Sequence, residues 1–251
     1  MHHIMPQRKT QRALRPGSRV RLHGHVWRVQ SVTEVDAGPG RTLKESAAGY
    51  AVAAAAAASP GDVPWCVVVG GPNGAGKTTF ALEYLPRYAA CHEFVNPDLI
   101  AAGLAPLDPA AAGMRAGRLV LERVRELSAR RMSFGFETTF SGRGHLATLA
   151  ALKNHGYRVC LVLIWVSRAD LCAARVACRV RAGGHDVPEA DLRRRGPRIV
   201  ANLPRYRALA DRFLLLDNTG QVPVCVYQRC EEDEWIKDAD RFARIRGEVG
   251  L

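Results

Sequence analysis

The chain has 251 residues, enough for one α/β domain with a small extension. Hydrophobic residues make up 47% of the sequence and charged residues 24%, an ordinary composition that excludes disorder over the whole length. No apolar run approaches the roughly 20 residues of a membrane-spanning helix, and the Ala-rich segment 47–58 lacks the Leu-rich centre of a signal sequence. We therefore expect a cytoplasmic protein without a membrane partner.

The formal net charge is +12, and residues 1–50 contribute half of it, with nine Lys or Arg against three acidic residues. A second basic cluster runs from Arg175 to Arg212. A basic protein attracts an acidic partner, which here is nucleic acid, a membrane surface, nucleotide phosphates or an acidic protein. Composition alone does not choose among these partners.

Seven cysteines are spread along the chain without a Cys-x-x-Cys pair, and several lie inside apolar runs. This pattern predicts reduced, buried thiols rather than a disulfide framework. The eight histidines are scattered too, so nothing in the sequence supports a zinc site.

Residues 1–62 carry no chemical motif. Val20–Leu22 and Val26–Val32 are predicted to pair as a small β-ribbon. The Ala-rich segment from Leu43 to Ala58 is predicted to be helical, and the turn-forming residues 59–62 end it. We therefore expect a small N-terminal extension over residues 1–62 and the main domain over residues 63–251.

From Val63 onward, strand-like apolar runs alternate with helix-like segments. This alternation predicts an α/β fold, in which a parallel sheet carries helices on both faces. The expected strands are Trp65–Val69, Glu93–Val95, Ser133–Glu137, Arg158–Val166 and Phe213–Leu216. The expected helices are Thr78–Leu85, Ala110–Arg130, Gly144–His155, Ala169–Arg181 and Glu189–Leu203.

A glycine-rich stretch matches the phosphate-loop (P-loop) pattern G-x-x-x-x-G-K-[ST]. It follows an apolar strand and opens a helix, as such a loop requires, so the sheet is expected to be of the P-loop NTPase type. Its backbone N–H groups and the helix N-terminus favour phosphate. Lys77 is expected to reach the β- and γ-phosphates of ATP, and Thr78 to bind Mg²⁺. The expected nucleotide-binding residues of this loop are Gly71, Pro72, Asn73, Gly74, Ala75, Gly76, Lys77, Thr78 and Thr79.

Two acidic residues are candidates for chemistry at ATP. Asp98 follows the strand Glu93–Val95, and Glu137 ends the strand Ser133–Glu137, so both should lie at the sheet edge where parallel sheets bind ligands. One carboxylate near the γ-phosphate can accept the proton of an attacking hydroxyl, and the other can hold sugar-like hydroxyls. Two structural alternatives stay open: Asp98 as a helix N-cap over Leu99–Ala102, and Glu137 as an exposed strand end.

A third acid, Asp217, ends the apolar run Phe213–Leu216, where a motor or switch ATPase would carry a magnesium-binding acid. The residues Asn218-Thr219-Gly220 follow it, and small kinases with this fold often place such a loop beside adenine. A structural or base-side role is therefore favoured over magnesium binding, and both stay open.

The basic cluster contains arginines that flank the flexible pair Gly183-Gly184. Arg175 and Arg179 are four residues apart and share one helix face. Arginines beyond the glycines could swing over the nucleotide, where phosphoryl transfer needs cations. The alternative, a solvated basic helix, is reasonable for at least half of them. His185 has no partners that would make a metal site.

Four motifs, in this order, resemble those of the zeta toxin family. They are Gly-Pro-Asn-Gly-Ala-Gly-Lys-Thr-Thr (71–79), Phe-Val-Asn-Pro-Asp (94–98), Ser-Phe-Gly-Phe-Glu-Thr-Thr (133–139) and Arg-Val-x-x-Arg-Val-Arg-x-Gly-Gly-His-Asp-Val-Pro-Glu (175–189). The resemblance covers about residues 63–220 and leaves residues 1–62 unexplained. The chain departs from the family where Gly196-Pro197 follows the three arginines 193–195, at a place where relatives tend to carry an aromatic residue.

The resemblance implies a P-loop kinase that uses ATP and Mg²⁺. Well-known members of the family are toxins of toxin–antitoxin pairs and phosphorylate UDP-N-acetylglucosamine on a sugar hydroxyl, so a nucleotide-sugar substrate and an antitoxin partner are implied here. Asp98 would be the general base, and Lys77 would act on the phosphates. The implied acceptor-binding residues are Asn96, Glu137, Thr138 and Thr139. The arginines implied to act on ATP are Arg175, Arg179 and Arg195.

Two other functions remain as alternatives. One is a phosphotransferase on the same scaffold that acts on the hydroxyl of a nucleoside, sugar or antibiotic. The other is a nucleic-acid-binding ATPase, which the basic charge favours. Against nucleic acid stands the scarcity of interleaved aromatic residues in positions 1–62, where Trp27 and Tyr50 are the two present.

Overall fold

The computed structural model describes residues 19–22, 25–28, 63–89, 91–181, 187–231 and 233–251. Near the N-terminus, Arg19–Leu22 (β1) pairs antiparallel with His25–Arg28 (β2), so the predicted ribbon is present at those residues. The two strands belong to a unit separate from the rest of the described chain. The predicted Ala-rich helix over 43–58 lies outside the described residues.

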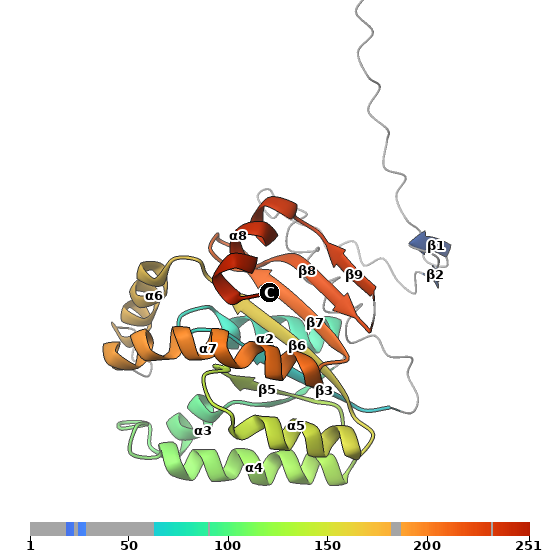
Figure 1. The fold of residues 1–251 in the computed structure, drawn as a ribbon. Helices are drawn as coiled ribbons and strands as arrows, with labels where there is room; N and C mark the ends of the chain where they lie inside the picture. The colour runs from blue at the N-terminus through green and yellow to red at the C-terminus, as the bar shows by residue number, and fades with distance from the viewer. Residues whose placement is uncertain (1–18, 23–24, 29–62, 90, 182–186, 232) are drawn as a thin grey trace, which may run out of the picture. The chain divides into compact units, whose positions relative to one another are not determined.

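A seven-stranded sheet forms the centre of the main unit, in the order β4-β5-β3-β6-β7-β8-β9 (Figure 1). The first five strands in this order are parallel, as the alternation of strands and helices predicts. The strands are Trp65–Gly70 (β3), Glu93–Val95 (β4), Phe134–Thr138 (β5), Arg158–Trp165 (β6), Arg212–Asp217 (β7), Val224–Cys230 (β8) and Asp233–Ile236 (β9).

The last two strands, β8 and β9, pair antiparallel with their neighbours, and the sequence pattern does not predict them. The connection from β7 to β8 spans residues 218–223, which is too short for the crossover that a further parallel strand needs. The sheet is therefore mostly parallel with an antiparallel edge.

Helices cover both faces of the sheet (Figure 1). One apolar cluster joins α4, α5, α7 and α8 to one face, and a second joins α2 and α6 to the other. The helices are Lys77–Tyr88 (α2), Pro97–Leu104 (α3), Gly113–Ala129 (α4), Gly144–Asn154 (α5), Ala169–Arg181 (α6), Glu189–Leu209 (α7) and Ala239–Val249 (α8). None of the helices in the described ranges has the length and hydropathy that a bilayer crossing requires.

Helix α7 is longer than predicted, because it continues past Pro204 to Leu209. A proline inside a helix removes one backbone hydrogen bond and normally marks a boundary. Here Leu203 and Tyr206, on either side of Pro204, are fully buried, so packing outweighs the lost bond. The sequence pattern does not predict α8, and it offers α3 only as the short helix Leu99–Ala102 that Asp98 would cap. All seven cysteines are free thiols, five of them buried.

Candidate active site

The glycine-rich loop lies between β3 and α2, as predicted, with glycines in backbone conformations that other residues rarely adopt. Gly71 has φ +145°, and a Cβ there would come within 2.1 Å of the carbonyl oxygen of Ile164 on β6. Gly76, the N-cap of α2, has φ +87°. The loop therefore needs glycine both for its turn and for its close approach to the neighbouring strand.

Lys77 begins α2 and is 6% exposed. Its Nζ donates a hydrogen bond to the carbonyl oxygen of Pro72 (2.9 Å) and lies 3.7 Å from Oε1 of Glu137. Burial lowers the pKa of Lys77, while the charges of Glu137 and Asp98 raise this pKa and the charge of Arg179 lowers it further. The charges of Glu137, Asp98 and Arg179 therefore all act on the Lys77 ammonium group.

Glu137 lies next to the P-loop because β5 pairs with β3. In this register Glu137 stands beside Val69 and Thr138 beside Gly70, so the carboxyl ends of both strands are level. Oε2 of Glu137 accepts hydrogen bonds from the hydroxyl of Thr78 (2.6 Å) and from the amide of Asn96 (2.7 Å). Glu137 is 8% exposed, so the interpretation as an exposed strand end is wrong.

Asn96 connects this cluster to helix α3. Its side-chain oxygen caps the helix by accepting from the backbone N–H of Asp98 (2.8 Å) and of Leu99 (3.1 Å). The interpretation of Asp98 as the N-cap is therefore wrong, because α3 begins at Pro97, two residues before Leu99, and Asn96 is the cap. Asp98 lies in the first helical turn, half-buried, and its carboxylate is not needed for capping.

Two of the expected arginines reach the nucleotide side of the site through hydrogen bonds with its loops. Arg195 on α7 donates to Oδ1 of Asn73 in the P-loop (3.1 Å). Arg175 on α6 donates to the carbonyl oxygens of Asn218 (2.9 Å) and Gly220 (3.1 Å). Arg175 thus holds the loop after β7, and direct contact of these arginines with ATP stays a prediction.

Asp217, at the end of β7, is 1% exposed and is occupied by structural contacts. Its carboxylate accepts from Arg244 on α8 (3.0 Å) and from the backbone N–H of Thr219 (2.9 Å), and lies 3.6 Å from Arg241. The strand β6 separates β7 from the P-loop strand β3. The next residue, Asn218, donates to the carbonyl oxygen of Ala75 in the P-loop (2.8 Å). These contacts support a structural role of Asp217 rather than magnesium binding, and a role beside the base stays a prediction.

Thr138 and Thr139, which follow Glu137, begin a loop that is held by hydrogen bonds the sequence pattern does not predict. The hydroxyl of Thr138 accepts from the backbone N–H of Phe140 (3.3 Å), and the hydroxyls of Thr139 and Ser141 are 2.7 Å apart. Asn202 on α7 donates from its side-chain amide to two carbonyl oxygens of this loop. The available signal is Asn202 itself, a polar residue between the apolar Ile199 and Leu203 of a predicted helix.

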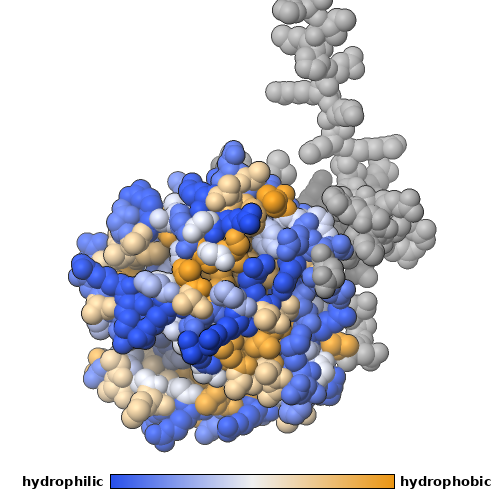
Figure 2. Space-filling view, in the orientation of Figure 1, coloured by the Kyte–Doolittle hydropathy of each residue, from blue (hydrophilic) through white to orange (hydrophobic). Residues whose placement is uncertain are grey.

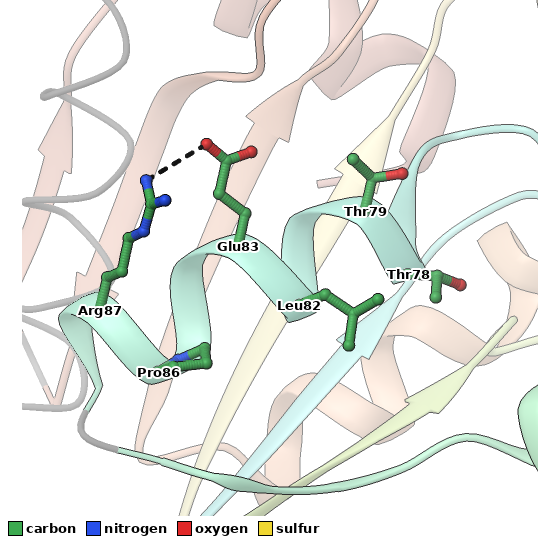
Figure 3. A pocket seen from close by; sticks show the side chains of 6 residues that line it. All are labelled: Thr78, Thr79, Leu82, Glu83, Pro86 and Arg87. Atoms are coloured by element: carbon green, nitrogen blue, oxygen red, sulfur yellow. Dashed lines mark ion pairs between the residues drawn. The ribbon is translucent and has the colours of Figure 1, made fainter.

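A groove of about 420 Å³ begins at Thr78 and runs along the solvent side of α2 (Figure 3). Its wall includes the exposed Leu82 and the pair Glu83–Arg87, which are 3.7 Å apart. The groove contains neither Lys77 nor the carboxylates of Asp98 and Glu137. It is therefore an extension of the phosphate-binding end of α2 rather than the centre of the charged cluster.

Comparison with protein families gives a match to the AAA domain over residues 66–196, from β3 into α7. An uncharacterised protein of Haemophilus influenzae is 29% identical over 119 residues, which make up 47% of this chain and 83% of that protein.

Two solved structures share the fold. A chain of the AvrRxo1-ORF1:-ORF2 crystal structure with ATP aligns with a TM-score of 0.61 and 18% identity, over 80% of this chain and 69% of that chain. A chain of the PezAT chromosomal toxin–antitoxin system of Streptococcus pneumoniae aligns with a TM-score of 0.55 and 17% identity, over 84% of this chain and 97% of that chain. These alignments confirm the expected P-loop α/β fold and, at the level of the fold, the resemblance to zeta toxins.

Proposed function

The chain belongs to the AAA domain family, and we propose that it is an ATP-dependent kinase that phosphorylates a hydroxyl of a nucleotide sugar such as UDP-N-acetylglucosamine. One observation carries the proposal: a half-buried carboxylate, Asp98, has no capping duty and lies within electrostatic reach of Lys77 at the P-loop. A group in this position can take a proton from a hydroxyl that attacks the γ-phosphate.

The nucleotide side of the site binds the triphosphate of ATP. Backbone N–H groups of residues 73–78 and the N-terminus of α2 surround the phosphates, and Lys77 neutralises part of their charge. Arg195 and Arg179 add positive charge from α7 and α6, with Arg175 next to the base-side loop. Bound phosphate raises the lowered pKa of Lys77 back toward its ordinary value, because the negative charge of the phosphate offsets the hydration that Lys77 loses on burial.

The residues present fit a magnesium ion. The hydroxyl of Thr78 and the carboxylate of Glu137 are 2.6 Å apart, and such hard oxygen donors, together with phosphate oxygens and water, are what Mg²⁺ prefers. Bound there, Mg²⁺ would neutralise charge on the β- and γ-phosphates. Asn96 keeps Glu137 in place by donating to the same carboxylate oxygen.

Phosphoryl transfer needs an acceptor oxygen in line with the bond that breaks. The acceptor hydroxyl forms a bond to the γ-phosphorus, the bond from that phosphorus to the bridging oxygen breaks, and ADP leaves. Asp98 takes the proton of the hydroxyl. Thr138 and Thr139, with Asn96, line the side from which the acceptor approaches. The antitoxin partner is part of the proposal as well, supported by the likeness in fold to a chain of a toxin–antitoxin system.

The test compares Asp98→Asn with wild type in a reaction containing ATP, Mg²⁺ and UDP-N-acetylglucosamine, with the phosphorylated sugar detected by mass spectrometry. Asparagine keeps the size of the side chain but cannot take the proton, so kcat should fall by about 10²–10⁴-fold while the Kd for ATP stays near that of wild type. Asp108→Asn, on an exposed loop, is the matched control and should leave kcat unchanged. A near-normal kcat in Asp98→Asn would remove Asp98 from the mechanism.

A further inference from the structure

Helix α7 carries three polar side chains on the face that is turned toward the sheet. Arg195, Asn202 and Tyr206 are spaced by seven and four residues, a spacing that places them on one side of a helix. Arg195 contacts the P-loop, whereas Asn202 and Tyr206 contact the loop of residues 140–142. Figure 2 shows the hydrophilic outer surface where α7 lies, and the exposed residues there include Arg194, Arg198 and Arg205.

Asn202 uses its whole side chain for these contacts. It is 5% exposed, and its Nδ2 donates to the carbonyl oxygens of Phe140 (3.2 Å) and Ser141 (3.1 Å). Its Oδ1 accepts from Nε of Arg143 (3.3 Å). Both the Nδ2 and the Oδ1 of this buried amide are therefore hydrogen-bonded. Removing the amide would leave the carbonyl oxygens of Phe140 and Ser141 without this donor, which is costly inside a protein.

The loop that Asn202 holds has a conformation that needs support. Phe140 has φ +57°, in the left-handed region that residues other than glycine seldom adopt. Its ring lies directly on Gly70, where a Cβ would come within 2.0 Å of Cε2 of Phe140. The ring also packs against Tyr206, at 4.7 Å between centroids, and the Tyr206 hydroxyl donates to the carbonyl oxygen of Gly142 (2.7 Å).

We infer that Asn202 is a positioning residue for the phosphate acceptor, an inference that rests on the proposed function. The hydroxyl of Thr138 accepts from the backbone N–H of Phe140, and the hydroxyl of Thr139 accepts from the backbone N–H of Ser141 (3.5 Å) and lies 2.7 Å from the Ser141 hydroxyl. Asn202 binds the carbonyl groups of the same two residues, 140 and 141. It therefore sets the place of the two threonine hydroxyls without touching the acceptor itself.

The experiment measures steady-state kinetics of Asn202→Ala with UDP-N-acetylglucosamine as the acceptor. The variant loses both hydrogen bonds to the loop, so the KM for the acceptor should rise about tenfold while the KM for ATP stays within about twofold of wild type. A merely structural role would lower the melting temperature and raise both KM values together.

Two further variants make the result independent of one substitution. Asn218→Ala is a matched comparison, because it removes the same kind of amide-to-carbonyl bond from the P-loop, and it should raise the KM for ATP instead. Tyr206→Phe keeps the ring on Phe140 and loses only the bond to Gly142, so a folded protein is expected even if Asn202→Ala misfolds. Its KM for the acceptor should rise about threefold.

The outcomes separate the inference from the proposed function. If wild type phosphorylates the acceptor and neither Asn202→Ala nor Tyr206→Phe changes its KM, the inference is wrong and the proposed function stands. The inference is equally wrong if the KM values for the acceptor and for ATP rise together. If wild type transfers no phosphoryl group to UDP-N-acetylglucosamine, the proposed acceptor is wrong and the inference falls with it.

Discussion

The P-loop, residues 71–79, gives the nucleotide side of the site one uninterrupted stretch, whereas the acceptor side is assembled entirely from separate segments. Asn96 and Asp98 come from the connection between β4 and α3 and the start of α3, Thr138 and Thr139 from the end of β5, and Asn202 from α7. On the nucleotide side, contacts such as that of Lys77 with Pro72 span five residues. On the acceptor side, Asn202 and Phe140 are 62 residues apart.

This difference determines how each side responds to change. A P-loop is a local structure, since its glycines and the first turn of α2 make most of its shape. The acceptor side depends on the register of β5 with β3 and on the packing of α7, so distant residues influence it. We therefore expect sharp, local losses from substitutions in residues 71–79 and selective effects on acceptor binding from substitutions elsewhere.

The largest effect is expected on the nucleotide side, from Lys77→Met. Phosphoryl transfer should fall by about 10³-fold or more, because the charge that balances the phosphates is lost. Turnover is measured by release of ADP. More than about a tenth of the wild-type rate would contradict the role of Lys77 and the assignment of the loop.

The melting temperature of Lys77→Met should rise. Burial is the largest cause of the lowered pKa of Lys77, so the protonated side chain costs folding free energy at neutral pH. This gain over wild type should fade as the pH rises from the lowered pKa toward the ordinary value of 10.5, because wild-type Lys77 then loses its charge in the folded state. A lower melting temperature at neutral pH would show that Lys77 stabilises the loop instead.

The next largest effect decides to which side Glu137 belongs. The resemblance implies acceptor binding, whereas the short contact with the Thr78 hydroxyl favours magnesium. If Glu137 binds magnesium together with Thr78, Glu137→Gln should raise the Mg²⁺ concentration for half-maximal turnover by about 10–100-fold. The KM for the acceptor, measured at saturating Mg²⁺, should then stay close to that of wild type. A raised acceptor KM with unchanged Mg²⁺ dependence would assign Glu137 to the acceptor side.

The smallest effect is expected from removal of residues 1–60. Every residue proposed for either side of the site lies between positions 71 and 220, and β3 begins at Trp65. The truncated chain should keep kcat and both KM values within about twofold of the full chain. Kinetics together with the melting temperature test this. Aggregation or loss of ATP binding would show that the proposed boundary between residues 62 and 63 is wrong.

Much of the fold can be predicted from local patterns. The parallel strands and the helix Ala169–Arg181 are where periodicity places them, because buried strands and amphipathic helices leave distinct spacings in the sequence. The antiparallel strands β8 and β9 are missed. β9 has four residues, most of them exposed, and the buried run of β8 includes the polar Gln228 and is followed by Arg229. The end of α7 is missed because the signal of Pro204 is local and the packing of Tyr206 is not.

The sequence by itself determined the P-loop, since a contiguous motif between an apolar strand and a helix specifies its own backbone shape. It also named Asp98 and Glu137 as candidates. Only the tertiary structure decided that Asn96 caps α3 and leaves Asp98 free of that duty, and that Glu137 faces Thr78. It alone connected Asn202 to the loop after β5. The physical reason is that these contacts arise from strand register and helix packing, which bring together residues with no spacing that a linear sequence records.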